Sequence, residues 1–124
     1  MSQQLIKQLR EQRMAWVVVD DACTPPKRVR IIRPTEVELA QHFIKAGEVS
    51  VGFDQVKEFV VGWDGFTEAD LLGAGVGAAD AVPFSPPLWA EVASDHSTWV
   101  RTVAQALLDA AIAHTQKLDD TLKN

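Results

Sequence analysis

One cysteine and three histidines are the first candidates for a nucleophile or a metal site in this 124-residue chain. Cys23 is the one cysteine, so the chain forms no internal disulfide and fits a reducing compartment. A catalytic thiol needs a histidine partner, and His42, His96 and His114 are scattered over separate segments. None of the three stands at zinc-ligand spacing from another histidine or from Cys23. We therefore expect no catalytic residue and no metal site here.

The glycine-rich stretch GAGVGAAD, which starts at Gly73, superficially resembles a phosphate-binding loop. Its glycines follow the spacing G-x-G-x-G instead of the dinucleotide pattern G-x-G-x-x-G, and no Gly-Lys-Ser/Thr tripeptide exists. A calcium loop counted from Asp64 also fails, because Phe66 and Ala69 stand where an oxygen ligand and a glycine are needed. We expect a flexible surface loop over residues 73–81, with no cofactor.

Serine and carboxylate chemistry has no better support in the sequence. Ser85 and Ser97 are explained as helix N-caps, and no G-x-S-x-G motif occurs. The pair Asp119 and Asp120 falls at the end of a predicted helix, where solvation explains it. The sequence therefore predicts a protein that is not an enzyme.

The charged residues are distributed unevenly along the chain. Residues 1–33 hold seven basic and three acidic side chains (+4), whereas residues 34–124 hold five basic and fourteen acidic ones (−9). An acidic body disfavours nucleic acid as the main partner, since phosphate binding needs a concentrated positive field. Arg28, Arg30 and Arg33 keep an alternative open, a small nucleic-acid-binding regulatory or adaptor protein. No aromatic residue is interleaved with them in the sequence, which weakens a single-strand stacking platform.

The elements that would position these residues begin with a helix and a hairpin. Apolar residues on one face predict a helix over residues 2–14. Residues 15–19 and 28–33 are rich in β-branched side chains and predict two strands. The loop between them carries turn residues and two prolines, so we expect an antiparallel hairpin.

The middle of the chain has one clear signal and one ambiguous segment. Thr35 and Glu38 match a capping box, which predicts a helix that ends at Gly47. In residues 53–61 the apolar spacing of 3, 4 and 3 favours a helix, while the density of valine favours a strand. We favour the helix and leave the strand open.

The C-terminal half is predicted to be mostly helical. Thr67 and Asp70 form a second capping-box pattern, and Ser85 followed by proline is a strong helix start. The longest apolar periodicity predicts a final helix over residues 98–122. The fold class is thus α+β: a helix-rich single domain over residues 1–124 with a short N-terminal β-hairpin and a long C-terminal helix. Residues 1–33 are the helix and hairpin arm, and residues 34–124 are the helical body.

Tryptophans and the last helix are the best candidates for binding another polypeptide. Four tryptophans are many for this length, and tryptophan is a favoured interface anchor as well as a core residue. The apolar stripe of the last helix continues to its end, further than one small core needs, which leaves surface for a partner or for a second copy. The predicted contact residues are Trp89, Trp99, Leu107, Ala111, Leu118 and Leu122.

Three segments together resemble a known family. They read FVVGWDGFTEADLLG from Phe59, VPFSPPLWAEV from Val82 and WVRTVAQALLDA from Trp99. The series is similar to the tail assembly chaperones of long-tailed bacteriophages and prophages, whose pattern is Trp-x-Gly-apolar, a polar insert, and apolar-Pro-Phe-Ser/Thr opening a helix. The residues that match this motif, to which the resemblance gives a structural role, are Trp63, Gly65, Phe66, Val82, Pro83, Phe84 and Ser85.

The resemblance implies a binding protein without catalytic activity or cofactor. Such proteins bind the long, aggregation-prone tape measure protein, keep it soluble and assist the recruitment of tail tube subunits. It also implies the cytoplasm of a bacterial host cell as location. No secretory signal and no run of apolar residues long enough for a membrane span is visible in the sequence. A homo-oligomer is a further expectation.

Overall fold

A three-stranded antiparallel sheet lies at the centre of the computed structural model, which describes residues 2–73 and 75–123. The strand order is β1-β2-β5. The strands are β1 (Met14–Asp20), β2 (Lys27–Ile32) and β5 (Val60–Asp64). The predicted α+β fold with an N-terminal hairpin is confirmed.

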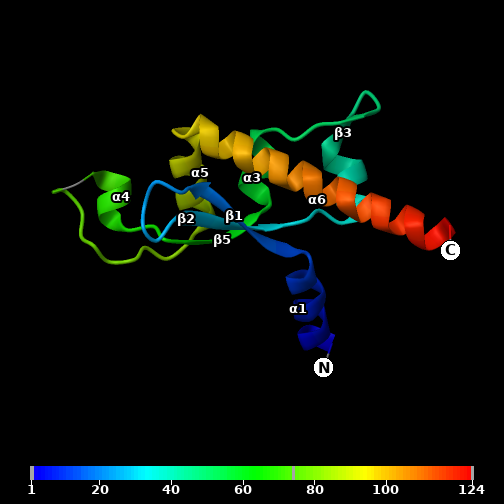
Figure 1. Ribbon diagram of the computed structural model, residues 1–124, viewed down its shortest axis with the longest axis horizontal. Helices are drawn as coiled ribbons and strands as arrows, with labels where there is room; N and C mark the ends of the chain where they lie inside the picture. Colours follow the sequence, from blue (N-terminus) through cyan, green and yellow to red (C-terminus); the bar gives the residue numbers. More distant parts are fainter. Residues whose placement is uncertain (1, 74, 124) are drawn as a thin grey trace.

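Three helices cover one side of this sheet (Figure 1). The long helix α6 (Ser97–Lys123) packs mainly over β1, and α3 (Phe53–Glu58) lies next to β5. The helix α5 (Pro86–Ser94) packs against both α3 and α6. The hydrophobic core fills the space between the sheet and these helices.

The hairpin follows the alternation of its sequence. Val29 and Ile31 of β2 are buried against the helices, while Arg28 and Arg30 point to the other side of the sheet. Because β2 is the central strand, it belongs to the core. The division of the chain at residue 33 therefore does not follow the packing.

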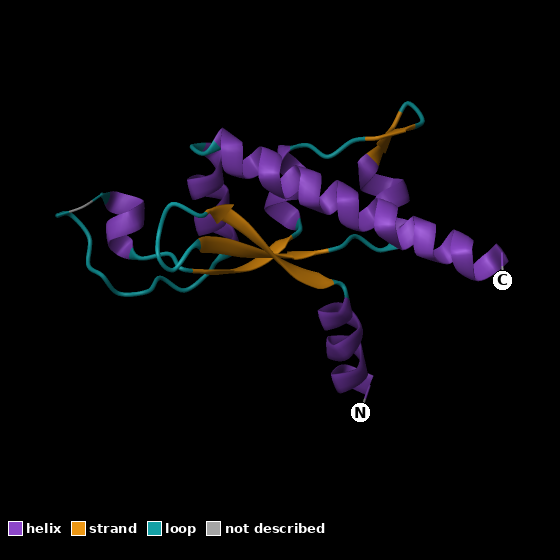
Figure 2. Ribbon diagram, in the orientation of Figure 1, coloured by secondary structure: helices purple, strands orange, loops and turns teal. Residues whose placement is uncertain are grey.

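The first helix, α1 (Ser2–Gln12), stands apart from the sheet and from the helices that cover it (Figure 2). None of its eleven described residues is buried. Its apolar face remains in solvent, with Leu5, Ile6 and Leu9 each more than half exposed. An amphipathic helix with no partner is the feature of this fold that most needs an explanation.

The prediction of a helix over residues 53–61 is only half right. The helix α3 begins after Gly52, whose N–H donates to Gln55 Oε1 at 2.8 Å, and it ends at Glu58. Val60 then starts β5, which pairs antiparallel with β2. The regular apolar spacing came from two consecutive elements. The valines of the second gain more from the edge of an existing sheet than from another helical turn.

The capping box at Thr35 is confirmed, but the helix it starts is short. The Thr35 hydroxyl accepts from the Glu38 N–H at 3.2 Å, and Glu38 Oε1 accepts from the Thr35 N–H at 2.9 Å. The helix α2 (Glu36–Glu38) continues as the π-helix η1 (Leu39–Phe43). The π-helix then ends in a small hairpin.

The prediction that a helix ends at Gly47 was wrong. This residue lies in the two-residue turn between β3 (Ile44–Lys45) and β4 (Glu48–Val49). Ala46 and Gly47 both have positive φ, 53° and 82°, which is the backbone of a type I′ hairpin turn. Glycine with a positive φ occurs both at helix C-termini and in hairpin turns. Gly47 alone therefore could not show which of the two the chain forms here.

The glycine-rich segment forms a loop that folds back on α4 (Glu68–Leu72), with Ala74 outside the described residues. The C=O groups of Ala78 and Asp80 accept from the N–H groups of Ala69 and Glu68. The backbone donors at the start of α4 are thus already used. The loop therefore offers no phosphate cradle at this helix.

The final helix is confirmed over its whole predicted length and extends one residue further at each end. Ser85 caps α5 by accepting from the Leu88 N–H at 3.3 Å. A short break at residues 95–96 separates α5 from α6. The core-facing residues of α6 are spaced by four, and they are Trp99, Val103, Leu107 and Ala111. None of the described side chains after Ala111 is buried, so the last three turns of α6 run beyond the core.

Candidate protein-binding surfaces

The residues of the family-like motif form an aromatic cluster. The ring of Trp63 stacks on Phe66 with centroids 4.4 Å apart and meets the edge of Phe84 at 5.6 Å. Phe66 in turn contacts Trp99 edge-on at 5.8 Å. The indole N–H of Trp63 donates to the C=O of Val82 at 2.7 Å. The cluster joins β5, the segment before α5 and the start of α6.

Gly65 and Ser85 hold the backbone of the same region, whereas Pro83 is exposed. Gly65 has φ 87°, and a Cβ on it would lie 2.7 Å from the C=O oxygen of Pro26. This close approach brings the end of β5 against the β1–β2 loop. The arrangement agrees with a structural role for the motif.

Gly65→Ala is expected to lower the free energy of unfolding by at least about 2 kcal/mol, since it combines left-handed strain with a backbone clash. Gly47→Ala is the matched control, because Gly47 has a similar φ of 82° but no atom within 4 Å of the added Cβ. It should lose only about 1 kcal/mol. Urea unfolding of both variants measures the difference, and equal losses would show that the contact with Pro26 is unimportant.

Four of the six predicted contact residues lie in the core, so their assignment to a binding surface was wrong. Trp89 and Leu107 are fully buried, Ala111 is 5% exposed and Trp99 is 9% exposed. The indole N–H of Trp89 donates to the C=O of Val56 at 3.2 Å, which fixes α5 on α3. These side chains are needed where α3, α5 and α6 meet, and they offer no area to a partner.

The remaining two predicted residues lie on the surface, and one of them, Leu118, lines a groove. Leu118 and Leu122 are 38% and 84% exposed, on the part of α6 that runs beyond the core. Leu118 faces α1 across a groove of about 830 Å³. Its lining residues are Leu9, Gln12, Arg13, Arg33, Ala110, Ala113, His114, Lys117, Leu118 and Thr121. We call this the α1–α6 groove.

The α1–α6 groove has a leucine on each of its partly polar walls, Leu9 and Leu118, and a basic floor formed by Arg13 and Arg33. Arg13 donates to the C=O of Arg33 at 2.7 Å and lies 3.7 Å from Glu38. Burial and the neighbouring charge of Arg13 lower the pKa of Arg33, although the group stays cationic. With Lys117 these side chains give the groove a positive potential. A segment with apolar and acidic side chains would complement it.

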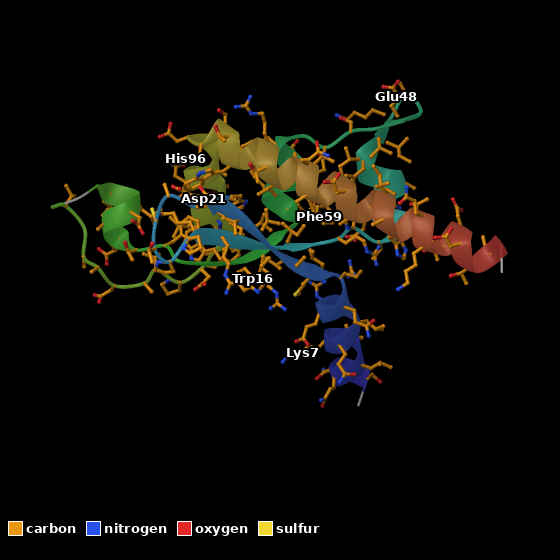
Figure 3. All side chains as sticks on the ribbon, viewed as in Figure 1. Lys7, Trp16, Asp21, Glu48, Phe59 and His96 are labelled. Carbon is orange, nitrogen blue, oxygen red and sulfur yellow. The ribbon has the colours of Figure 1, made fainter. Side chains whose placement is uncertain are left out.

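A second exposed surface lies on the sheet face opposite the helices, and the sequence had not suggested it. Trp16 is 43% exposed and lies on the side away from α6 (Figure 3). The guanidinium of Arg28 lies 4.2 Å from the centre of its ring, and that of Arg30 lies 5.7 Å away. The cluster could not be predicted from the sequence, because Trp16 and Arg30 are 14 residues apart and become neighbours only when β1 pairs with β2. No aromatic residue is interleaved with these arginines in the sequence, but the fold places the ring of Trp16 beside two of them.

Cys23 has a structural partner in place of a histidine. Lys27 is only 5% exposed, and its Nζ donates to Cys23 Sγ at 3.0 Å and lies 3.4 Å from Asp70. Burial alone would lower the pKa of Lys27, but the bond to Cys23 and the charge of Asp70 raise it. Hydrogen bonds from Thr67 and the charge of Lys27 lower the pKa of Asp70. The group ties the β1–β2 loop to α4.

This ion pair predicts a small pH dependence of stability. A carboxyl whose folded pKa is lowered stabilises the fold above its unfolded value of 3.8, and this contribution disappears as the pH falls through the folded value. Between pH 6 and 3 the wild type should therefore lose more stability than Asp70→Asn, by up to about 1 kcal/mol. Thermal unfolding at both pH values tests this, and parallel losses would contradict it.

No protein-family model, no curated protein and no solved structure matches the chain. Within residues 2–73 and 75–123, no three His, Cys, Asp or Glu side chains come together as a metal site. None of the helices described has the length and apolar content needed to cross a bilayer.

Proposed function

We propose that this protein is a tail assembly chaperone of a long-tailed bacteriophage or prophage. It binds the tape measure protein in the bacterial cytoplasm, keeps it soluble and assists the recruitment of tail tube subunits. The observation that carries the proposal is the α1–α6 groove, whose two helices both expose leucines that the described chain leaves uncovered. The resemblance of the motif from Trp63 to Ser85 to this family also supports the proposal.

The groove suits an amphipathic helix from a long helical protein. Leu9 is 54% exposed on one wall and Leu118 is 38% exposed on the other. Full burial of a leucine side chain stabilises by roughly 1.5–3 kcal/mol, so covering the groove yields useful binding energy. A helix laid between two helices would use its own apolar stripe for this contact. The basic floor, with Arg13 and Arg33, favours a helix that also carries acidic residues.

Binding of this kind would keep an aggregation-prone helical protein in solution. A long protein exposes many apolar stripes before it assembles, and each stripe is a potential contact with another copy. One chaperone molecule covers one such stripe. Tube subunits would then replace the chaperones, which requires an interaction of moderate strength; an open, partly polar groove is consistent with that.

Co-expression with the tape measure protein, which the proposal expects to be encoded beside this chain, tests the proposal. We expect that protein to become soluble and to co-purify with this chain. Leu118→Asp should lose both effects, whereas Ile112→Asp should keep them. Ile112 is a matched control, since it is 45% exposed on the same helix but faces Leu39 and Val49. Aggregation of the long protein in the presence of the wild-type chain would reject the proposal.

One observation favours a second candidate function, nucleic-acid binding. The exposed ring of Trp16 and the guanidinium groups of Arg28 and Arg30 combine a stacking surface with positive charge. The balance of −9 over residues 34–124 opposes it. Titration with a single-stranded oligothymidylate and a duplex at about 150 mM salt separates the candidates. Tight binding that Trp16→Ala and Arg30→Ala abolish would favour nucleic acid.

A further inference from the structure

The outer edge of β1 is open along residues 14–18, and the regular β1–β2 register is interrupted only after Val18. β1 is an edge strand of seven residues, and no strand in the part of the chain that the structure describes pairs with its free side. Between Arg13 and Asp20 it contains neither a charged residue nor a proline. Natural edge strands usually carry such residues, because an open apolar edge pairs with other strands. This edge therefore has the character of an interface.

The hydrogen bonds of β1 show which of its groups are free. The N–H of Arg33 donates to the C=O of Arg13 at 2.7 Å, which extends the β1–β2 ladder by one pair. In an antiparallel ladder, successive residues direct their N–H and C=O groups to opposite edges of the strand. The N–H and C=O groups of Met14, Trp16 and Val18 consequently point away from β2, to the free edge.

We propose that two copies of this protein join along β1, in antiparallel orientation, to form one six-stranded sheet. The two-fold axis passes beside Val17, the middle residue of β1. Trp16 of each copy then lies opposite Val18 of the second copy, and the free groups of these residues form a hydrogen-bonded pair. Val17 lies opposite Val17 of the second copy, in a pair without hydrogen bonds.

The side chains support this register. Trp16 and Val18 are 43% and 47% exposed on the same face of the sheet, and the pairing covers both with an aromatic–aliphatic contact. A shift by one residue would place side chains of the open face opposite those of the core face. A shift by two keeps the faces but leaves the end of each strand unpaired. The register centred on Val17 places the pairs of Trp16, Val17 and Val18 within the regular part of β1, before the register shift that follows Val18.

The charges at the two ends of β1 are also complementary. Arg10 and Arg13 precede the strand, whereas Asp20 and Asp21 end it. Antiparallel pairing brings the basic end of one copy beside the acidic end of the second copy. A pairing of two copies in parallel orientation would instead place like charges together, which costs stability.

A cysteine at the two-fold axis tests the register directly. In a Cys23→Ser background, Val17→Cys should form an intermolecular disulfide under mild oxidation. The Cα atoms of an antiparallel pair without hydrogen bonds are about 4.5 Å apart, within the disulfide range. Val19→Cys is the control, because its two copies would lie about 13 Å apart along the strands. A disulfide at Val19 as fast as at Val17, or none at Val17, would overturn the register.

Sedimentation equilibrium of the chain alone tests the association itself. The wild type should show a concentration-dependent dimer, and Val18→Lys should weaken dimerisation by at least tenfold while circular dichroism confirms the fold. A wild type that stays monomeric up to about 1 mM contradicts the proposal. A dimer insensitive to Val18→Lys would mean that the copies meet elsewhere, for example at Leu122 of α6. These measurements need no partner, so their failure is distinct from failure of the proposed function.

Discussion

Replacing Trp89 by alanine lowers the free energy of unfolding by about 3–5 kcal/mol, the largest stability effect we expect from a single substitution. Trp89 is fully buried where α3, α5 and α6 meet. The substitution leaves a cavity in this position. It also removes the hydrogen bond from the indole N–H to the C=O of Val56, which has a length of 3.2 Å. Urea unfolding followed by circular dichroism measures the loss.

Trp16→Ala is the control for this prediction. Trp16 is 43% exposed, and its removal should change the stability of the monomer by about 1 kcal/mol or less. The comparison must be made at a protein concentration low enough to avoid dimers. If Trp89→Ala lowers the free energy of unfolding no more than Trp16→Ala does, Trp89 does not stabilise the core. The prediction that Trp89 is a contact residue would then be favoured.

The largest effect on binding is expected from a double substitution in the α1–α6 groove, Leu9→Asp with Leu118→Asp. The variant should bind an amphipathic helical peptide of the tape measure protein at least about 100-fold more weakly than the wild type. The variant lacks the stabilisation that the wild type gains when the partner buries each leucine. In addition, each new carboxylate must be desolvated in the complex. Both positions are exposed in the free chain, so stability should change little. Isothermal titration calorimetry measures the affinity.

The matched control is Ile112→Asp, which adds the same charge to α6 outside the α1–α6 groove. The affinity of this variant for the peptide should stay within about threefold of the wild-type value. The new charge lies outside the groove, where solvent and salt largely screen it. A double variant that binds as tightly as Ile112→Asp would exclude the groove as the binding site. A loss of binding in all variants alike would point to net charge as the cause.

The parts of the fold that were predicted correctly from the sequence depend on neighbouring residues. The hydroxyl groups of Thr35, Thr67 and Ser85 each cap a backbone N–H three residues further on, as the sequence patterns indicate. The last helix was predicted almost to the residue, because its apolar periodicity is long. Such signals need no knowledge of the remaining chain.

The errors in the fold concern contacts between distant residues. β5 exists because β2 offers an edge about 30 residues away, and Val29 lies opposite Trp63 only in the folded chain. Valine content and helical spacing pointed in different directions, and the tertiary pairing decided between them. Gly47 was assigned to a helix end because the π-helix and small hairpin before it have no comparable sequence signal.

The exposed surfaces that we propose for binding could be predicted only in part for the same reason. The apolar stripe of α6 correctly indicated more surface than the core uses, and Leu118 and Leu122 are indeed exposed. Sequence alone could not separate them from Leu107, because burial depends on where the sheet ends beneath the helix. The amphipathic pattern of α1 was visible, but a helix that leaves its apolar face open looks the same in sequence as one that packs.

The central claim is that the α1–α6 groove holds a helix of another polypeptide. Photo-cross-linking from benzoylphenylalanine at position 113 tests it most directly, with position 112 as the control. Ala113 lines the groove, while Ile112 is its neighbour on α6 and faces Leu39 and Val49. In a complex with the tape measure protein, position 113 should cross-link to that protein and position 112 should not. Equal cross-linking from both positions, or cross-linking from position 112 alone, would contradict the account.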